Sequence, residues 1–402
     1  MTSEWHEVPL RELVGYISKG IAPSYAEEAS ETTIRVLNQK CNRNFRISYG
    51  DSRLHDTLKK KVPPERYVKP DDILINSTGA GTAGRIAQIE DVPSATTIDG
   101  HMILIRSNGK VTQKFLGYAL KAHQWEVLQL DEGSTGQTEL NRDRLLDEIM
   151  INYPVSFDEQ NAIVGTLESI DRKLIVNKEI NDNLEQQAQA IYHERFETVS
   201  PNDLPSEWRI VTLGEVATIS NKSFNPLKEP EILLEHYSIP AFDEARFPVF
   251  ELSTSIKSNK FIIDASCFMI SKLNPTTKRV WKPYCLTGNA VCSTEFIVYK
   301  AKDKTITDFL YSVIDSNSFS DFMCSHVTGS TGSRQRTTPS DTLSYELILP
   351  SEDELAEFQS LVSPMYAQIR INAIENDRLK RLRDSLLPKL MSGEIDVSDI
   401  QL

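Results

Sequence analysis

The chain carries an internal duplication that spans almost its whole length. Ser3–Leu13 (Ser-Glu-Trp-His-Glu-Val-Pro-Leu-Arg-Glu-Leu) returns as Ser206–Val216, at an offset of 203 residues. Asn177–Leu184 returns as Asn372–Leu379, at an offset of 195 residues. Markers that recur in the same order and at nearly the same spacing indicate two copies of one structural unit. We therefore expect two similar bodies rather than one continuous core.

A glycine-rich tetrapeptide supplies a third marker between the other two. Gly133–Gly136 and Gly329–Gly332 both read Gly-Ser-Thr-Gly, 196 residues apart. In each copy a proline, Pro154 or Pro350, follows the last glycine after 18 residues. The offset falls from 203 to 196 between the opening and this loop, so the first copy is longer in that stretch.

Composition describes an ordinary globular protein with one local anomaly. The chain has 402 residues, 40% of them hydrophobic and 25% charged, which is enough for a sizeable core in each copy. A net charge of −13 argues against a protein that coats nucleic acid indiscriminately. Residues 32–69 nevertheless carry ten basic and three acidic side chains. That stretch is either a solvated loop surface or a patch that faces phosphates.

Several classes of chemistry lack their usual sequence patterns. The five cysteines form no CxxC pair and no cluster with histidine, so we expect no zinc site. Their odd number, without a signal peptide, is typical of the reducing cytoplasm. No apolar run approaches about 18 residues, so no membrane span is expected. There is no GxxxxGK[ST] loop for ATP, no methyltransferase-type Asn-Pro-Pro-aromatic stretch, and no catalytic arrangement around the seven histidines.

Gly79–Gly84 matches the GxGxxG dinucleotide fingerprint, but its context does not fit. The glycines should open a helix that receives a pyrophosphate. Here they lead into Arg85–Ile89, which alternates like a strand. At an offset of 194 the second copy keeps the Ser, Thr and Arg of this loop and loses the glycines; the pairs are Ser77/Ser271, Thr82/Thr276 and Arg85/Arg279. We therefore expect no nucleotide cofactor.

The hydrophobic pattern predicts an α+β chain. The front of each copy consists of short apolar runs between turns, with helices expected at Gln113–Gln129 and Thr307–Met323. The back of each copy changes to spacings of three and four, which is typical of a long helix with a coiled-coil seam. The prediction is two pseudo-symmetric globular α/β domains joined by two long antiparallel helices. Their ranges are 1–155 and 201–350 for the domains, 156–200 for the first spacer helix, and 351–402 for the second spacer helix and C-terminal tail.

Asparagines interrupt both helical seams at matching places. Because a buried asparagine layer costs stability but fixes register, we predict one central layer formed by Asn177, Asn181, Asn372 and Asn376. The alternative is that all four face solvent. Pro364 lies early in the second helix and should break or kink it there.

Polar and basic side chains gather in two loops of each copy. Loop one is Ser77–Arg85 and its mate Ser271–Trp281; loop two is Gly133–Arg144 and its mate Gly329–Thr338. Arginine, lysine, asparagine and glutamine make the contacts to base edges and phosphates, although exposed loop side chains are often only solvated. The candidate DNA contacts are Arg35, Asn38, Lys40, Ser77, Arg85 and Gln137 in the first copy, and Ser238, Lys272, Asn274, Lys278, Arg279, Arg334, Gln335 and Arg336 in the second. Arg85 or Arg279 could instead brace its own loop against a carboxylate.

The order of these motifs resembles the DNA specificity subunit of a type I restriction-modification enzyme, over essentially the whole chain. The Trp-x-x-Val-x-Leu-x-Glu openings at Trp5 and Trp208 resemble the starts of that family's two target-recognition domains. Asp72–Arg85 and the Gly-Ser-Thr-Gly loops follow in the family order. The ending Leu386–Ile395 is typical as well.

The resemblance implies a role without catalysis. Each domain would read one half of a bipartite double-stranded DNA target in the major groove, and the helices would act as a spacer. Two modification subunits carrying S-adenosylmethionine would bind, followed by restriction subunits that use ATP and Mg²⁺. Adenine methylation and cleavage would belong to those partners, and the complex would be cytoplasmic.

Two other functions fit the same pattern. One is an orphan or anti-restriction relative that occupies modification subunits without directing cleavage. The other is a protein-binding adaptor built from two similar domains on a coiled coil. Neither the target bases nor the length of the gap follows from the sequence.

Overall fold

The computed structural model describes residues 4–79, 81–132, 139–329 and 335–397, and the chain divides into two compact units. Unit 1 comprises residues 1–173 and 379–402, and unit 2 comprises residues 174–378. Each unit contains one globular domain together with a stretch of each long helix. Helices and sheets are mixed in both, which confirms the predicted α+β class.

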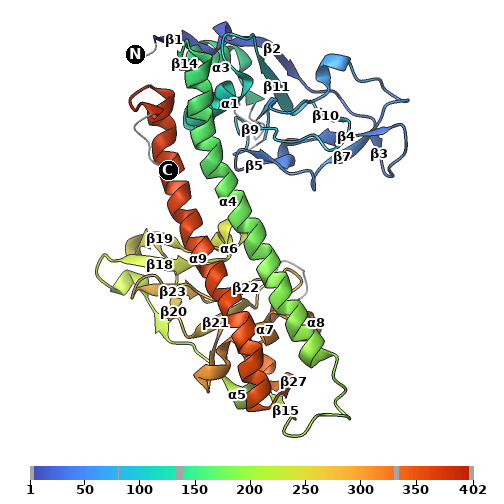
Figure 1. Cartoon of the computed structure of the whole chain (residues 1–402), viewed down its shortest axis with the longest axis vertical. Coiled ribbons are helices and arrows are strands. Elements are labelled where there is room, and N and C mark those ends of the chain that lie inside the picture. Colours follow the sequence, from blue (N-terminus) through green and yellow to red (C-terminus); the bar gives the residue numbers. More distant parts are fainter. Residues whose placement is uncertain (1–3, 80, 133–138, 330–334, 398–402) are drawn as a thin grey trace. The chain divides into compact units, whose positions relative to one another are not determined.

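The first domain is built on two four-stranded sheets (Figure 1). The sheet β2-β11-β8-β9 is antiparallel and its central strand β8 is fully buried, as its Ile-Leu-Ile-Asn sequence predicts. The sheet β10-β4-β7-β3 contains one parallel pair, β10 with β4. The strands are β2 (Val14–Lys19), β11 (Met102–Ser107), β8 (Ile73–Asn76), β9 (Ile86–Gln88), β10 (Thr96–Ile98), β4 (Thr33–Leu37), β7 (Arg53–Asp56) and β3 (Tyr25–Ala26), with the two-stranded pairs β1 (Trp5–Pro9) with β14 (Met150–Pro154), β12 (Asp131–Glu132) with β13 (Glu139–Leu140), and β5 (Asn42–Arg43) with β6 (Arg46–Ile47).

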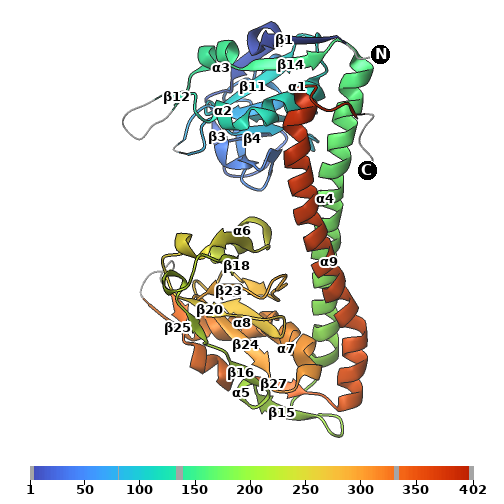
Figure 2. The same cartoon turned by 90° about the vertical axis from the view of Figure 1, so that its left-hand side faces the viewer.

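The second domain repeats the first of these sheets, while its other sheet has five strands in the order β17-β20-β23-β18-β19 (Figure 2). Its sheet β16-β24-β21-β22 has the strand order of β2-β11-β8-β9, and its parallel pair β18/β23 corresponds to β4/β10. The strands are β16 (Ala217–Ile219), β24 (Phe296–Ala301), β21 (Cys267–Ser271), β22 (Val280–Trp281), β17 (Ser223–Phe224), β20 (Lys260–Ile262), β23 (Ala290–Ser293), β18 (Leu233–Tyr237) and β19 (Val249–Leu252), with the pairs β15 (Arg209–Thr212) with β27 (Glu346–Leu349) and β25 (Val327–Thr328) with β26 (Arg336–Thr337).

Each of the two helices predicted inside the domains is in fact two short ones. The second of them breaks before Ser316, whose hydroxyl accepts from the Phe319 backbone N–H and starts a new helix. Such a cap reorients the chain where the pattern alone suggested continuity. The short helices are α1 (Gln113–Ala122), α2 (Gln124–Val127), α3 (Arg142–Glu148), α5 (Leu213–Val216), α6 (Ile239–Ala245), α7 (Thr307–Ile314) and α8 (Asn317–Ser325).

The long helices are α4 (Phe157–Tyr192), followed by a π-helical turn at His193–Glu197, and α9 (Glu352–Met391). The residues that the spacing of three and four assigns to the seam are all buried or half-buried: Ile163, Leu167, Ile170, Leu174, Asn177, Asn181, Leu184, Ala188 and Ile191 in α4, and Phe358, Val362, Met365, Ile369, Asn372, Asn376, Leu379, Arg383, Leu386 and Leu390 in α9. Within unit 2 Asn177 contacts Asn376 and Asn181 contacts Asn372, so the two helices run antiparallel there.

Of the break or kink predicted at Pro364, the break does not occur, because α9 remains helical on both sides of it. Pro364 lies on the exposed side of the helix, where water can solvate the carbonyl left without an N–H partner. Its neighbours Val362 and Tyr366 are buried in the core of unit 2. The tertiary packing of these neighbours therefore outweighs the tendency of proline to interrupt a helix.

Each domain core takes in part of both long helices. In unit 1, Ile163 and Leu167 of α4 and Leu387 and Leu390 of α9 join the core that contains Phe115. In unit 2 the same role falls to Ala188 and Tyr192 of α4 and to Phe358 and Val362 of α9. The helices are thus integral to both domains. Every helix in the described part of the chain is too short or too polar to cross a bilayer.

Candidate nucleic-acid interface

Strand register aligns loop one of the two domains. The Asn76 N–H donates to the Arg85 carbonyl at 2.9 Å, and the Ser271 N–H donates to the Arg279 carbonyl at 2.9 Å. Arg85 and Arg279 are therefore equivalent, as predicted. Ser271, however, corresponds to Asn76 and not to Ser77, because the second loop is one residue shorter. The predicted Ser77/Ser271 match is corrected accordingly.

Loops one and two, predicted separately, lie side by side in both domains. The Leu140 N–H donates to the Ser77 carbonyl at 2.8 Å, and the Thr337 N–H donates to the Lys272 carbonyl at 3.1 Å. Isolated bridges extend both pairings, between Thr78 and Glu139 and between Leu273 and Arg336. The same backbone frame therefore joins the loops in each domain.

A third segment completes this frame, at the end of β4 or β18. Asn38 and Ser238 follow these equivalent strands, and both cap the next turn: Asn38 accepts from the Lys40 N–H at 2.8 Å, and Ser238 from the Ala241 N–H at 3.2 Å. The turn then reaches loop one, through Asn42 to the Arg85 carbonyl at 2.8 Å in the first domain. We call the combined surface the three-loop face; it comprises residues 38–42, 77–85 and 139–144 in the first domain and 238–246, 271–281 and 335–338 in the second, apart from residue 80.

In the first domain some of the residues predicted to contact DNA hold the loops together, and others lie at the surface. Ser77 is buried and its backbone joins the loops, while Asn38 serves as a cap. Arg35 is half-buried and donates to the Ser52 hydroxyl at 3.0 Å. Arg85 donates to the Gly81 carbonyl at 3.3 Å, within its own loop, and Lys40 is exposed. Gln137 lies outside the described residues.

In the second domain carboxylates hold two of the predicted arginines. Arg279 forms two bonds with Asp243 of α6, at 2.6 and 2.8 Å, which is the bracing role considered for it, with a carboxylate from outside its loop. Arg336 forms two with Glu295, at 3.0 and 3.1 Å, and this pairing raises the pKa of Arg336.

The remaining predicted residues of the second domain shape loop one or flank it. Asn274 bonds the Thr276 and Thr277 hydroxyls at 2.8 and 3.2 Å and has a positive φ of 50°, so it shapes the turn. Lys272 and Gln335 are half-exposed; the Gln335 carbonyl accepts from the Asn274 N–H at 2.9 Å. Arg334 lies outside the described residues.

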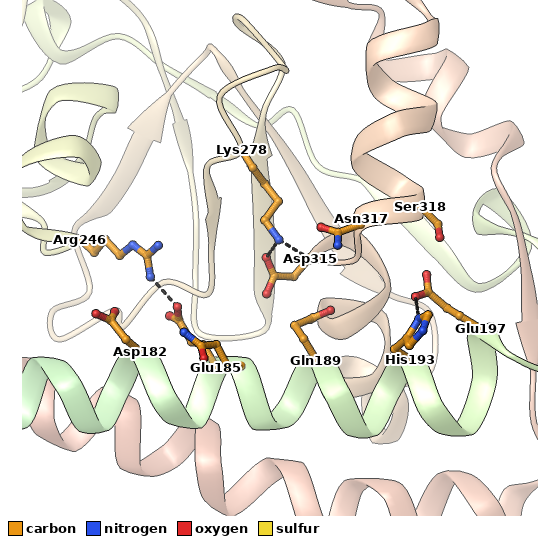
Figure 3. A pocket seen from close by; sticks show the side chains of 11 residues that line it. Asp182, Glu185, Gln189, His193, Glu197, Arg246, Lys278, Asp315, Asn317 and Ser318 are labelled. Carbon is orange, nitrogen blue, oxygen red and sulfur yellow. Dashed lines mark hydrogen bonds and ion pairs between the residues drawn. The ribbon is translucent and has the colours of Figure 1, made fainter. Parts of the chain in front are cut away.

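Lys278 points away from its own loop into a polar hollow of about 470 Å³ between the second domain and α4 (Figure 3). Its ammonium lies 3.0 Å from the Asp315 carboxylate. Burial raises the pKa of Asp315, and Lys278 partly offsets this. Nearby, Arg246 pairs with Glu185 of α4 at 2.5 Å. Lys278 thus attaches loop one to the turn between α7 and α8, and Arg246 attaches the end of α6 to α4.

The glycine at the end of the fingerprint has a packing role. Gly84 has a φ of +85°, and a Cβ there would lie 2.8 Å from the Val127 carbonyl at the end of α2. A side chain would collide with that backbone. Strand β9 follows directly, as the alternation of Arg85–Ile89 predicted.

Sequence reasoning missed several side-chain pairs that form at these loops only in the fold. Thr78 shares a 2.8 Å hydrogen bond with His101, and it lies 3.4 Å from the Gln39 side-chain oxygen. Lys19, Glu139, Asp243 and Glu295 are likewise paired only through the fold. No sequence pattern marks them, because their partners are tens of residues away. Within the described residues no His/Cys/Asp/Glu group could hold a metal ion.

Comparison with known proteins shows what this chain is similar to. Residues 2–186 match the family model described as the type I restriction modification DNA specificity domain. The specificity subunit of the type I restriction enzyme MjaIX from Methanocaldococcus jannaschii is 25% identical over 384 aligned positions, covering 88% of this chain and 84% of that protein. The HindI specificity subunit from Haemophilus influenzae is 33% identical over 93 residues, 23% of this chain and 20% of its own.

A solved structure shares the fold. The S subunit of a type I restriction-modification system from M. genitalium superposes with a TM-score of 0.58 and 16% identity, covering 97% of this chain and 96% of its own. Residues 2–186 thus carry a match to a type I restriction modification DNA specificity domain, within a duplicated fold. Over most of its length the chain is similar to a specificity subunit of a type I restriction enzyme.

Proposed function

We propose that each domain reads one half of a bipartite DNA target through its three-loop face. The observation that carries this is the repeated backbone frame: Ser77 with Leu140 and Lys272 with Thr337 join the same loops in both domains. The side chains on that frame differ. A shared frame with different side chains suits two readers of unlike half-sites.

The side chains on the face have the chemistry for such contacts. Lys40 and Lys272 suit phosphates, which position a protein on the duplex without specifying sequence. Asn274, Gln335 and Arg336 are of the types that contact base edges. The net charge of −13 limits indiscriminate binding, because that binding grows with each neutralised phosphate. Stable binding should therefore require partner subunits.

The proposal includes the partners and assigns catalysis to them. Two modification subunits would supply S-adenosylmethionine and methylate adenine, and restriction subunits would supply ATP- and Mg²⁺-dependent cleavage. This chain would be non-catalytic and would act in the cytoplasm, with α4 and α9 as spacer and platform. The naming of its relatives as specificity subunits supports this division of labour.

Mapping methylated adenines in a host that carries this chain and its modification subunit tests the proposal. The expected result is two short sequence blocks separated by a gap of fixed length, lost when this chain is deleted. Methylation that is independent of the chain, or a single continuous block, would contradict it. Footprinting with the modification subunit separates the alternatives: an anti-restriction relative would bind the subunit without protecting DNA, and a protein adaptor would do neither.

A further inference from the structure

One position on the three-loop face carries opposite charge in the two domains. The bridges Thr78–Glu139 and Leu273–Arg336 place Glu139 and Arg336 at the same point of the frame. Their side chains are 55% and 45% exposed. An anionic acceptor therefore stands in the first domain where a cationic donor stands in the second.

The neighbours of this position are exchanged as well. The Ser77 N–H donates to the His101 carbonyl at 2.8 Å, and the Lys272 N–H to the Glu295 carbonyl at 2.9 Å, so His101 and Glu295 are equivalent. Glu295 is the counter-ion of Arg336. The counter-ion of Glu139 is instead Lys19, at the end of β2.

Strand register shows what replaces Lys19 in the second domain. Ile17 pairs with Ile105 and Ile219 with Tyr299, which places Asn221 where the first domain has Lys19. Each domain thus supplies its own counter-ion from a different element, the end of β2 in the first domain and the turn before β24 in the second. The two domains therefore differ both in the charge at the shared position and in the residue that orients it.

The contribution of the Lys19–Glu139 and Arg336–Glu295 ion pairs to folding stability is too small to explain why they are there. Half-exposed ion pairs contribute about 0–1 kcal/mol to folding, because water screens them. A charged group held in one orientation at a loop surface is, by contrast, what base recognition needs. Arginine contacts guanine O6 and N7, and a carboxylate accepts from the N4 amino group of cytosine.

We propose that Glu139 and Arg336 are specificity-determining residues at equivalent positions of the two half-sites, an inference that rests on the proposed function. Arg336 contacts a guanine, and Glu139 accepts from the amino group of a cytosine. Glu295 and Lys19 act as positioning residues for them. Both half-sites then contain a G·C pair at this place, contacted through the guanine in one and through the cytosine in the other.

The test is the base preference of the complete modification complex carrying Glu139→Gln or Arg336→Gln, measured on a library of randomised duplexes. A bidentate contact discriminates by about 1–3 kcal/mol, which is roughly 5- to 150-fold. We expect E139Q to lose that factor at one cytosine of the first half-site only, and R336Q at one guanine of the second only. Arg336→Lys should keep affinity but not the guanine preference, since lysine lacks the bidentate fork.

Two variants that remove an exposed ion pair elsewhere are the matched controls. Arg46→Gln releases Glu90 in the first domain, and Lys300→Gln releases Asp264 in the second. Neither should change base preference. Uniform weakening on every sequence, or an unchanged preference in both test variants, would overturn the inference. If the wild-type complex itself selects no bipartite site, the proposed function has failed instead.

Discussion

The two domains rest on the long helices through the same geometry but with different chemistry. In unit 1, Asp171 of α4 lies 3.0 Å from Lys121, 2.9 Å from Tyr118 and 2.9 Å from Arg383 of α9. In unit 2 the matching contact is neutral, a 2.7 Å hydrogen bond between Ser312 and Tyr366. At this position the first domain has a charged cluster, and the second has an uncharged hydrogen bond.

The apolar contacts between the long helices and the domains also differ between the two units. Phe358 of α9 stacks edge-on against Phe196 and Phe309, with ring centroids 5.2 and 6.0 Å apart. In unit 1 the corresponding helix position is Ile163, packed in the core that contains Phe115. The comparison teaches that the duplication kept the sites of burial, while the groups that fill them diverged.

Breaking the aromatic support should produce the largest effect. Phe358→Ala removes a fully buried ring and should lower the free energy of unfolding of unit 2 by about 3–5 kcal/mol. Hydrogen exchange should show faster opening in unit 2 than in unit 1. Leu361→Ala, 40% exposed on the same helix, is the control and should have little effect. Equal opening of both units would mean that they do not respond separately.

The charged support should make unit 1 sensitive to acid. Burial opposes ionisation of Asp171, but Lys121 and Arg383 outweigh it, so the pKa of Asp171 is lowered. Its contribution is therefore present above its unfolded pKa of about 3.9 and is lost as pH falls through the lower folded value. The neutral Ser312–Tyr366 contact has no such dependence in this range.

Asp171→Asn tests that difference. It should destabilise unit 1 by about 1–3 kcal/mol at neutral pH, because two cations lose their anionic partner. It should also flatten the dependence of unit 1 stability on pH below about 4. Chemical denaturation across pH measures both. Glu179→Gln, exposed on α4, is the control; an acid response of unit 1 that survives in D171N would show that other groups cause it.

The asparagine pairs between α4 and α9 lead to a prediction of opposite sign, a gain in stability. Asn177 and Asn372 are 1% and 4% exposed and bond Asn376 at 2.9 Å and Asn181 at 2.8 Å. Replacing all four asparagines with leucine removes both members of each pair, and should raise the free energy of unfolding by about 1 kcal/mol and loosen the helix register. Urea denaturation and solution scattering measure the two effects, with the exposed Asn183→Leu as control. Unchanged melting and scattering would show that the layer does not set register.

The smallest expected effect separates phosphate contacts from base contacts. Lys40→Gln should weaken the complex on all sequences alike and reduce the slope of log K against log salt by about 0.9. Lys272→Gln should act in the same way through the second domain. Titrations on cognate and scrambled duplexes at several salt concentrations measure this, with Lys178→Gln on α4 as control. Loss on the cognate duplex alone would assign these lysines to base reading.

Local pattern accounts for much of the fold. The strands at Ile73–Ile75 and Phe296–Tyr299 follow from continuous apolar runs, which are typical of strands buried on both faces. The long helices and their seam follow from apolar spacings of three and four, because one face of each helix is buried. The local pattern failed where a helix cap or tertiary packing determined the structure. Ser316 divides one predicted helix, and the buried neighbours of Pro364 keep another continuous.

The two copies of one α+β unit and the polar loops in each can be recognised from residue order alone, because repeats and polarity are local properties of the chain. Only the tertiary structure joined those loops into one face, because strand register brings Thr78 to Glu139 and Leu273 to Arg336. It also corrected Ser271 by one residue and gave Arg279 and Arg336 their carboxylate partners. Such contacts join residues 36 to 63 positions apart, a separation that no local period encodes.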